Sequence, residues 1–287
     1  MSGLSSALAE PFLNREPPTK RSLRPSFALL LMVAVVGGVA IAVLRPLRQS
    51  PSTSFREDTT LHAEIWETRE HGPRLQKMNQ LDAAGKRPTV ILRVTPTDQY
   101  QSIRGFGAAI TQASGTVWQS LQSESLRHEV INAYFGSDGI NATMARVPIN
   151  SCDFSEKGEY SFDDVPGDVQ CAHFDKSLRE DERSGLIPMA RAALSANPSL
   201  EFLASPWSPP AWMKSNGAMN GNGKPRGLLP AAEAAWALYI STWLGAFSAH
   251  GLNVSLLTVQ NEPQAPSPWE ACWYDAPQEA AFVSDHL

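Results

Sequence analysis

The sequence lacks the residue patterns that mark several large classes of protein. Its 287 residues include only three cysteines, Cys152, Cys171 and Cys272, without Cys-x-x-Cys spacing. Neither a zinc site nor a dense disulfide framework is therefore indicated, and at most one bridge could form within the chain. His-Glu-x-x-His, Gly-x-Ser-x-Gly and Gly-x-Gly-x-x-Gly are also absent, which argues against metallohydrolases, serine hydrolases and dinucleotide-binding folds. We expect no metal and no cofactor.

The sequence also lacks a surplus of basic residues. Its 24 lysines and arginines are outnumbered by 29 acidic residues, which gives a formal net charge of -5 at pH 7. Binding to a phosphate backbone requires clustered basic side chains, so we expect no nucleic-acid partner. With 43% hydrophobic and 18% charged residues, the composition is that of a globular protein.

Charge is missing entirely from one stretch near the N-terminus. Residues 27–44 contain no charged side chain, and as a helix they would extend roughly 27 Å, enough to cross the hydrocarbon of a bilayer. We predict a transmembrane signal anchor over residues 27–44, after a cytosolic tail of residues 1–26 and before a polar stalk of residues 45–60. The alternative is a cleaved signal peptide, because Ala40-Ile41-Ala42 fits a small-x-small cleavage site. Both alternatives place the remainder in the secretory pathway, with a lumenal (lysosomal or similar) or extracellular catalytic portion.

Beyond the stalk, strand-like and helix-like patterns follow one another. Residues 61–102 contain short apolar runs, notably residues 89–94, and predict a few antiparallel strands. From residue 103 onward, each strand pattern is followed by a helix pattern. The predicted pairs are strand 103–111 with helix 114–135, strand 142–149 with helix 184–197, strand 200–204 with helix 231–250, and strand 254–259 with a helix from about residue 276. Four such units predict an α/β fold with a parallel sheet and a site in the loops after the strands.

The fourth predicted strand ends in Gln260-Asn261-Glu262-Pro263. A carboxylic acid just past a buried strand can protonate a departing glycosidic oxygen, while a neighbouring amide holds a sugar hydroxyl. Partial burial would help Glu262 to remain protonated, as a general acid must. The competing interpretation is a carboxylate that faces solvent at the end of a strand.

Two other predicted strands are also followed by polar and aromatic residues. Asp153 follows the second strand and could accept two sugar hydroxyls, although a turn-capping role is equally open. Arg146 lies on that strand and could brace a carboxylate or form a structural ion pair. After the third strand, prolines stiffen the loop that carries Trp207, whose indole could stack on a sugar or simply pack.

Four strings of this sequence resemble those of one known family. RGFGAAIT, ARVPINSCDFS, FLASPWSPPAWMKSNGAMNG and VQNEP occur in the order and at the intervals typical of the glucosylceramidase family (acid β-glucosidase), glycoside hydrolase family thirty. The resemblance extends from about residue 103 to the C-terminus. It implies a TIM-type (β/α)8 barrel, with a β-sandwich built from both ends of the chain. It also implies retaining hydrolysis of glucosylceramide to glucose and ceramide, with a glycosphingolipid as the partner.

The resemblance also implies roles for individual residues. Glu262 would be the catalytic acid/base, and Arg146 would support the catalytic carboxylates. Four residues would bind the glucose, namely Asn261 at the 2-hydroxyl together with Asp153, Phe154 and Trp207.

The sequence departs from the family pattern in two respects. The family's nucleophile is a glutamate at the end of the seventh barrel strand, whereas only four strands are predicted in residues 103–287. We therefore expect a partial barrel without the nucleophile, inactive alone, that exposes two sheet edges unless another polypeptide completes it. The loop of residues 264–271 is shorter than in vertebrate lysosomal members, which leaves the aglycone open. A non-catalytic glycolipid-binding half-barrel and another specificity within the family are the alternatives.

Overall fold

A computed structural model describes residues 39–43, 64–72, 76–78, 95, 98–156 and 158–287. The chain forms two compact units, of residues 1–98 and 99–287. We describe each unit by itself.

The first unit contains a small antiparallel sheet. Its strands are β1 (Val39–Val43), β2 (Glu64–Thr68) and β3 (Gln76–Met78), in the order β1-β2-β3. Lys77 on β3 donates a hydrogen bond of 2.7 Å from its ammonium group to Glu64 Oε1 on β2. Strands β2 and β3 fall within residues 61–102, for which antiparallel strands are predicted. The strand predicted at residues 89–94 lies outside the described residues.

The predicted membrane helix is wrong over residues 39–43. Val39–Val43 forms strand β1, which pairs with β2 from Val39 opposite Thr68 to Val43 opposite Glu64. The sequence Val-Ala-Ile-Ala-Val is uncharged, as a membrane helix requires, but its β-branched residues also favour a strand. Residues 1–38 and 44–60 of the predicted tail, anchor and stalk lie outside the described residues. Within the described ranges, no helix has both the length and the apolar character to span a bilayer.

The second unit is built on a parallel sheet of four strands. These are β4 (Gly107–Ala109), β5 (Met144–Ile149), β6 (Glu201–Pro206) and β7 (Val254–Leu257), which lie side by side in chain order. Each strand is parallel to the next, as the alternation of strand and helix patterns predicts. This is the arrangement of the first four units of a (β/α)8 barrel. The carboxyl ends of all four strands therefore lie at one edge of the sheet.

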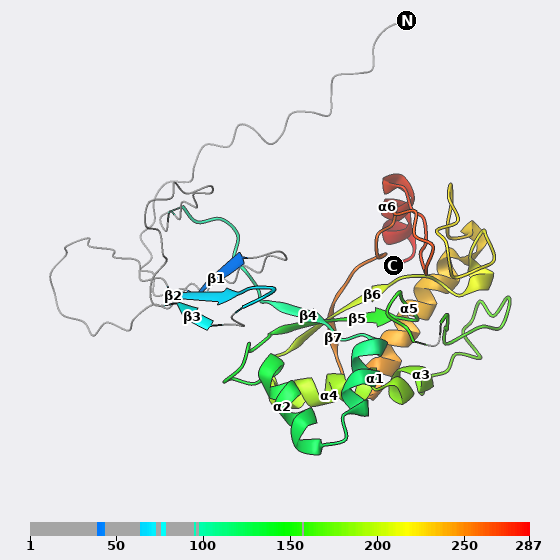
Figure 1. Cartoon of the computed structure of the whole chain (residues 1–287). Coiled ribbons are helices and arrows are strands. Elements are labelled where there is room, and N and C mark those ends of the chain that lie inside the picture. The colour runs from blue at the N-terminus through cyan, green and yellow to red at the C-terminus, as the bar shows by residue number, and fades with distance from the viewer. Residues whose placement is uncertain (1–38, 44–63, 73–75, 79–94, 96–97, 157) are drawn as a thin grey trace, which may run out of the picture. The chain divides into compact units, whose positions relative to one another are not determined.

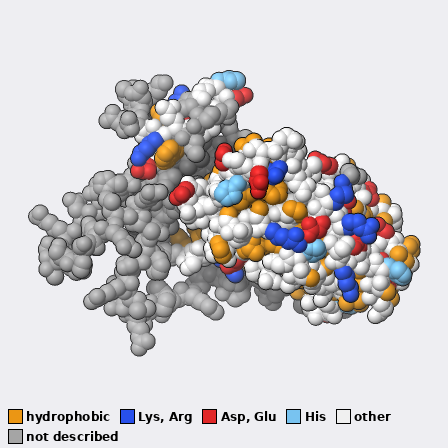
Figure 2. Space-filling view, turned by 90° about the horizontal axis from the view of Figure 1, so that it is seen from below, with side chains coloured by type: hydrophobic (Ala, Val, Ile, Leu, Met, Phe, Trp, Pro, Cys, Tyr) orange, Lys and Arg blue, Asp and Glu red, His pale blue; other side chains and the backbone are white. Residues whose placement is uncertain are grey.

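Helices connect these strands. They are α1 (Gln112–Ser120), α2 (Glu124–Phe135), α3 (Arg179–Ser184), α4 (Leu186–Ala196), α5 (Glu233–Ala249) and α6 (Ala276–Asp285), with 3-10 turns η1 (Ala211–Met213) and η2 (Pro230–Ala232). Helices α1, α2 and α4 lie on the same side of the sheet (Figure 1). The face seen from below in Figure 2 mixes acidic, basic and hydrophobic side chains.

One predicted helix is divided in two, and another begins slightly later than predicted. The helix predicted over residues 114–135 is interrupted before Ser123, whose hydroxyl caps α2 by accepting a hydrogen bond from Leu126 N. The helix predicted over residues 184–197 begins as α4 only after Gly185, whose φ of 88° ends α3. A capping hydrogen bond thus breaks the first predicted helix, and a left-handed glycine sets the start of the second.

Helix α5 supplies much of the core beneath the sheet. Trp236, Trp243 and Phe247 on this helix are fully buried. The rings of Trp243 and Phe247 stack with centroids 4.6 Å apart, and Phe247 meets Phe202 on β6 edge to face at 6.1 Å. These contacts fix α5 against β6, and with it the loops that leave the carboxyl ends of β6 and β7.

The two outer strands of the described sheet are open on one side. Strand β4 is exposed along its whole length, and three of the four residues of β7 are only half-buried. Within the described residues, β4 pairs only with β5 and β7 only with β6. The two exposed edges expected of a partial barrel are therefore present in this part of the structure.

Candidate active site

The loops after β5, β6 and β7 carry most of the predicted site residues. Asp153 and Phe154 follow β5, Trp207 directly follows β6, and Asn261 and Glu262 follow β7. Since these strands are neighbours and parallel, their following loops meet at the same edge of the sheet. Segments that lie more than a hundred residues apart in the sequence therefore come together at one site.

Arg146 on β5 connects these segments. Its Nε donates to Ser205 Oγ on β6 at 2.9 Å, and a terminal nitrogen donates to Asn261 Oδ1 at 2.7 Å. The guanidinium carbon also lies 4.4 Å from the centre of the Trp207 ring, within the range of a cation–π contact. The rigid, multiply donating guanidinium thus joins β5, β6 and the loop after β7.

The electrostatics of Arg146 connect it to two carboxylates. Burial lowers the pKa of Arg146, and the negative charges of Glu262 and Asp153 act in the opposite direction. Both carboxylates therefore lie within electrostatic range of the guanidinium. Its hydrogen bonds go to Ser205 and Asn261, so any support of the carboxylates acts through charge and through the placement of the loops.

Asn261 is held at both its backbone and its side chain. Its backbone N–H donates to Pro206 O at 2.8 Å, and its side-chain oxygen accepts from Arg146. With the oxygen occupied, the amide nitrogen is oriented as a donor, and it makes no hydrogen bond within the described residues. Such a donor can bind a sugar hydroxyl oxygen.

Gln260 is a site residue that the sequence analysis did not single out. It is buried, and its Nε2 donates to Trp207 O at 2.6 Å and to Asn261 O at 2.9 Å. The side chain thereby ties the loop after β7 to the loop after β6. The only feature of the sequence that could have indicated a role for Gln260 is its position as the first residue of the Gln-Asn-Glu-Pro string.

Glu262 has an unusual backbone conformation. Its φ is 47°, in the left-handed region that few residues other than glycine adopt. Hydrogen bonds hold it there, from Ala265 N to Glu262 O and from Tyr274 N to Pro263 O, each 3.0 Å long. Such strain tends to occur at functional sites, where the surrounding structure maintains it.

The side chain of Glu262 is exposed, so the partial burial expected of this residue is not found in the described structure. The physical reason is its position. It follows β7, the outer strand of the described sheet, and no neighbouring strand there covers it. A carboxyl group here is open to a ligand and to solvent alike.

The three residues expected to contact glucose besides Asn261 differ in exposure. Asp153 and Phe154 are exposed, whereas Trp207 is only 7% exposed. The loop of Phe154 is fixed by a hydrogen bond of 3.0 Å from Ala113 N to Phe154 O. Because Arg146 covers one face of the Trp207 ring, a sugar could contact only the small remaining surface.

A cavity of about 340 Å³ lies beside Asp153. The loops after all three strands line it, through Asp153, Glu159, Asn220, Trp269 and Glu270 among others. Glu270 is not among the site residues that the sequence predicts. Glu270 is only 4% exposed, and its burial arises from packing between loops, for which the sequence carries no signal.

A buried lysine supports one wall of this cavity. Lys214 is 2% exposed, and its ammonium group donates to Met219 O at 2.7 Å and to Gly221 O at 2.6 Å. Burial lowers its pKa to about 8. The ammonium group thus organises the loop after β6.

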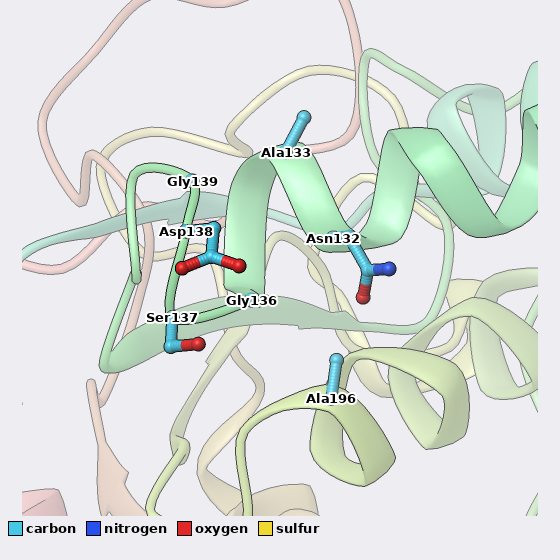
Figure 3. A pocket seen from close by; sticks show the side chains of 7 residues that line it. All are labelled: Asn132, Ala133, Gly136, Ser137, Asp138, Gly139 and Ala196. Atoms are coloured by element: carbon cyan, nitrogen blue, oxygen red, sulfur yellow. The ribbon is translucent and has the colours of Figure 1, made fainter.

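Two other hollows lie away from these residues. One, of about 380 Å³, is formed at the end of α2 and by the loop that follows, with Ala196 opposite (Figure 3). The other, of about 340 Å³, lies between α2 and α4. None of the predicted site residues lines either hollow. Among the described residues, no group of three or more His, Cys, Asp or Glu side chains is arranged to hold a metal ion.

Comparison with known proteins identifies the family. The model of the glycosyl hydrolase family 30 TIM-barrel domain matches residues 103–272, which include every predicted site residue. The chain therefore belongs to this family.

Relatives with different names are similar to this chain. The chain is 35% identical over 225 residues to putative glucosylceramidase 3 of Caenorhabditis elegans, covering 75% of this chain and 42% of that protein. It is 36% identical over 171 residues to the endo-1,6-beta-D-glucanase of Neurospora crassa, covering 59% and 35%. The crystal structure of SrfJ from Salmonella typhimurium is 42% identical with a TM-score of 0.61, covering 65% of this chain and 40% of SrfJ. The chain thus spans less than half the length of these relatives.

Proposed function

We propose that this chain supplies the acid/base side of a retaining β-glucosidase site, with Glu262 as the acid/base. The observation that supports this most directly is the hydrogen bond of 2.7 Å from Arg146 to Asn261, which joins the loop of Glu262 to β5. In this proposal Asn261, Asp153, Phe154 and Trp207 surround the glucose. Glu262 would protonate the departing glycosidic oxygen and later activate water.

Retention of configuration requires a second carboxylate about 5–5.5 Å from the first. In the family pattern this nucleophile follows a seventh strand, and the described barrel sheet has four strands. We propose that further polypeptide must complete the site before the ordinary reaction can proceed.

Glucosylceramide is the first candidate substrate. The support is the match to putative glucosylceramidase 3 of C. elegans and the Ser-Cys-Asp-Phe string at Asp153. With it belong a glycosphingolipid partner and a lumenal or extracellular location. The alternative that is not an enzyme is a half-barrel that binds glycolipid without catalysis.

A β-1,6-linked glucan is the second candidate substrate. It is favoured by the comparable identity to the N. crassa endo-1,6-beta-D-glucanase, 36% against 35% for the C. elegans relative. Both substrates present a β-glucosyl group to the same acid. They differ in the leaving group.

The acid role can be tested on the 287-residue chain with 4-methylumbelliferyl β-glucoside. We expect negligible release of the fluorophore by the chain alone. Molar azide should support release, because azide can form a C–N bond at the anomeric carbon as the C–O bond breaks and Glu262 donates its proton to the leaving oxygen. On methyl β-glucoside, whose alkoxide leaves only with a proton, Glu262→Gln should lower the azide-supported rate by roughly 10²–10⁴-fold, the usual contribution of a general acid. The fluorogenic substrate should lose much less, because its phenolate leaves readily without a proton.

Glu129→Gln is the matched control, since Glu129 is exposed on α2, away from the strand ends. It should leave the azide-supported rate unchanged. Equal azide-supported rates for Glu262→Gln and the wild type on methyl β-glucoside would contradict the acid role. Release without azide, lost in Glu262→Gln, would show that the chain already contains a nucleophile.

A further inference from the structure

We propose that Ser205 and Thr258 are positioning residues that orient the side-chain amide of Asn261 towards the 2-hydroxyl of the glucose. They act through Arg146 and touch neither the sugar nor the reacting atoms. The inference rests on the proposed β-glucosidase function. It adds two residues, not predicted as site residues, that determine how strongly the site recognises one hydroxyl group.

Ser205 on β6 and Thr258, the residue after β7, form a pair of hydroxyl groups between the two strands. Their oxygens lie 2.6 Å apart, Ser205 is fully buried and Thr258 is half-buried. Backbone hydrogen bonds hold this pair beside Asn261, because Thr258 N donates to Ala204 O at 3.0 Å and Asn261 N donates to Pro206 O at 2.8 Å. The hydroxyl pair and Asn261 therefore lie on one continuation of the pairing between β6 and β7.

The direction of the hydrogen bonds follows from Arg146, whose guanidinium can only donate. Its Nε donates to Ser205 Oγ at 2.9 Å, so this oxygen is an acceptor. The Ser205 proton needs an acceptor in turn, since a buried donor without a partner is costly. Among the described residues, the Thr258 oxygen is the one that receives it. Donation therefore runs from Arg146 to Ser205 and from Ser205 to Thr258.

The same guanidinium sets the orientation of Asn261. A terminal nitrogen donates to Asn261 Oδ1 at 2.7 Å, so the amide nitrogen is the group that faces a ligand. Trp207 lies against the face of the guanidinium, 4.4 Å from its carbon, and a contact of this kind does not fix the rotation of the group in its own plane. The directional bond to Ser205 does fix it. Without Ser205, the guanidinium can turn and Asn261 loses its fixed donor.

A purely structural role for the hydroxyl pair predicts a different outcome from a positioning role. Loss of stability or of loop order would slow the reaction of every glucoside alike. Loss of the Asn261 orientation would slow only substrates that have a 2-hydroxyl, because the hydrogen bond to this group strengthens in the transition state. A substrate without the 2-hydroxyl therefore separates the two roles.

The test compares azide-supported release from 4-methylumbelliferyl β-glucoside and from its 2-deoxy analogue by the 287-residue chain. The rate ratio of the two substrates in each variant is divided by the wild-type ratio, so that their different intrinsic reactivities cancel. Ser205→Ala should lower this ratio by about tenfold and Thr258→Val by about threefold, because each removes one hydrogen bond of the network. Thr258→Ser retains the hydroxyl and should keep the wild-type ratio.

Thr242→Val is the matched control. It replaces a threonine by the same residue as Thr258→Val, but the hydroxyl that it removes donates to Leu238 O within α5. The ratio should stay at the wild-type value.

Hydrogen exchange of the Arg146 Nε proton, followed by NMR of nitrogen-labelled protein, reports on the network without any sugar. Arg146→Lys identifies the signal. A proton that is bonded to a buried acceptor exchanges slowly, so we expect slow exchange in the wild type and in Thr258→Ser. Exchange should be faster in Ser205→Ala and in Thr258→Val.

The possible outcomes separate this inference from the proposed function. If exchange becomes faster while the substrate ratio stays at the wild-type value, the hydroxyl pair only supports the structure and the inference is overturned, although the proposed function stands. The inference is also overturned if Thr258→Ser lowers the ratio as much as Thr258→Val does. If the wild-type chain releases the fluorophore from neither substrate in azide, the proposed function itself fails, and this inference with it.

Discussion

At the scale of single residues, Asp181 on α3 is buried in an unusual state. None of its surface is exposed, Tyr160 donates to its Oδ1 at 2.7 Å, and its Oδ2 has no partner within the described residues. Burial raises the pKa of Asp181 to about 7, although the Tyr160 hydrogen bond acts in the opposite direction. The folded protein therefore holds a proton here over a range of pH in which an unfolded chain would release it.

This proton makes stability depend on pH. An unfolded aspartate has a pKa of about 3.9, so stability should fall as pH rises from about 4 to 7 and be constant above that. The total effect is on the order of 4 kcal/mol. Asp181→Asn cannot ionise, and we expect it to remove this slope. Urea unfolding at several pH values between 4 and 8 measures how the free energy of unfolding depends on pH, and Glu129→Gln is the control. If this dependence were the same in Asp181→Asn and in the wild type, the proton would not be held by Asp181.

At the scale of elements, the break between α3 and α4 depends on one glycine. Gly185 has a φ of 88°, and a Cβ placed there would lie 2.7 Å from Gly115 O on α1. We expect Gly185→Ala to destabilise the protein by about 2–4 kcal/mol, because it adds left-handed strain to a clash with backbone.

Gly245 on α5 provides the matched control for this substitution. No atom lies within 4 Å of the position that its Cβ would occupy. Since alanine is the better helix former, Gly245→Ala should be neutral or stabilising by up to about 1 kcal/mol. Urea unfolding of both variants measures the difference, and a Gly185→Ala protein as stable as Gly245→Ala would refute the close approach.

The same elements show what could be predicted from the sequence. The order of strands and helices was predictable because periodicity is local, and the Gln-Asn-Glu-Pro string marked the end of β7. The helix break before Ser123 was missed, because the capping hydrogen bond from Leu126 competes with a periodicity that continues. Glu270 and Lys214 could not be found as buried groups. Their burial arises only when loops distant in sequence pack together.

At the scale of the whole molecule, the open edges of the barrel sheet have consequences in solution. Strand β4 is exposed along its length, and the nearby Ile103 and Phe106 are 57% and 44% exposed. Unpaired strand edges beside apolar side chains favour pairing with another chain. We expect the 287-residue chain, expressed as it stands, to self-associate as its concentration rises.

A charge placed on the exposed edge should oppose this association. Ala108 is the middle residue of β4, and a lysine there would have to lose its hydration for a second strand to pair, which is how natural edge strands avoid association. We expect Ala108→Lys to raise the monomer fraction in sedimentation velocity over a concentration series. Ala281→Lys adds the same charge to the exposed surface of α6 and should have a much smaller effect. If both variants raised the monomer fraction equally, the cause would be net charge and not the strand edge. If the wild-type chain were monomeric at every concentration, association at this edge would be contradicted.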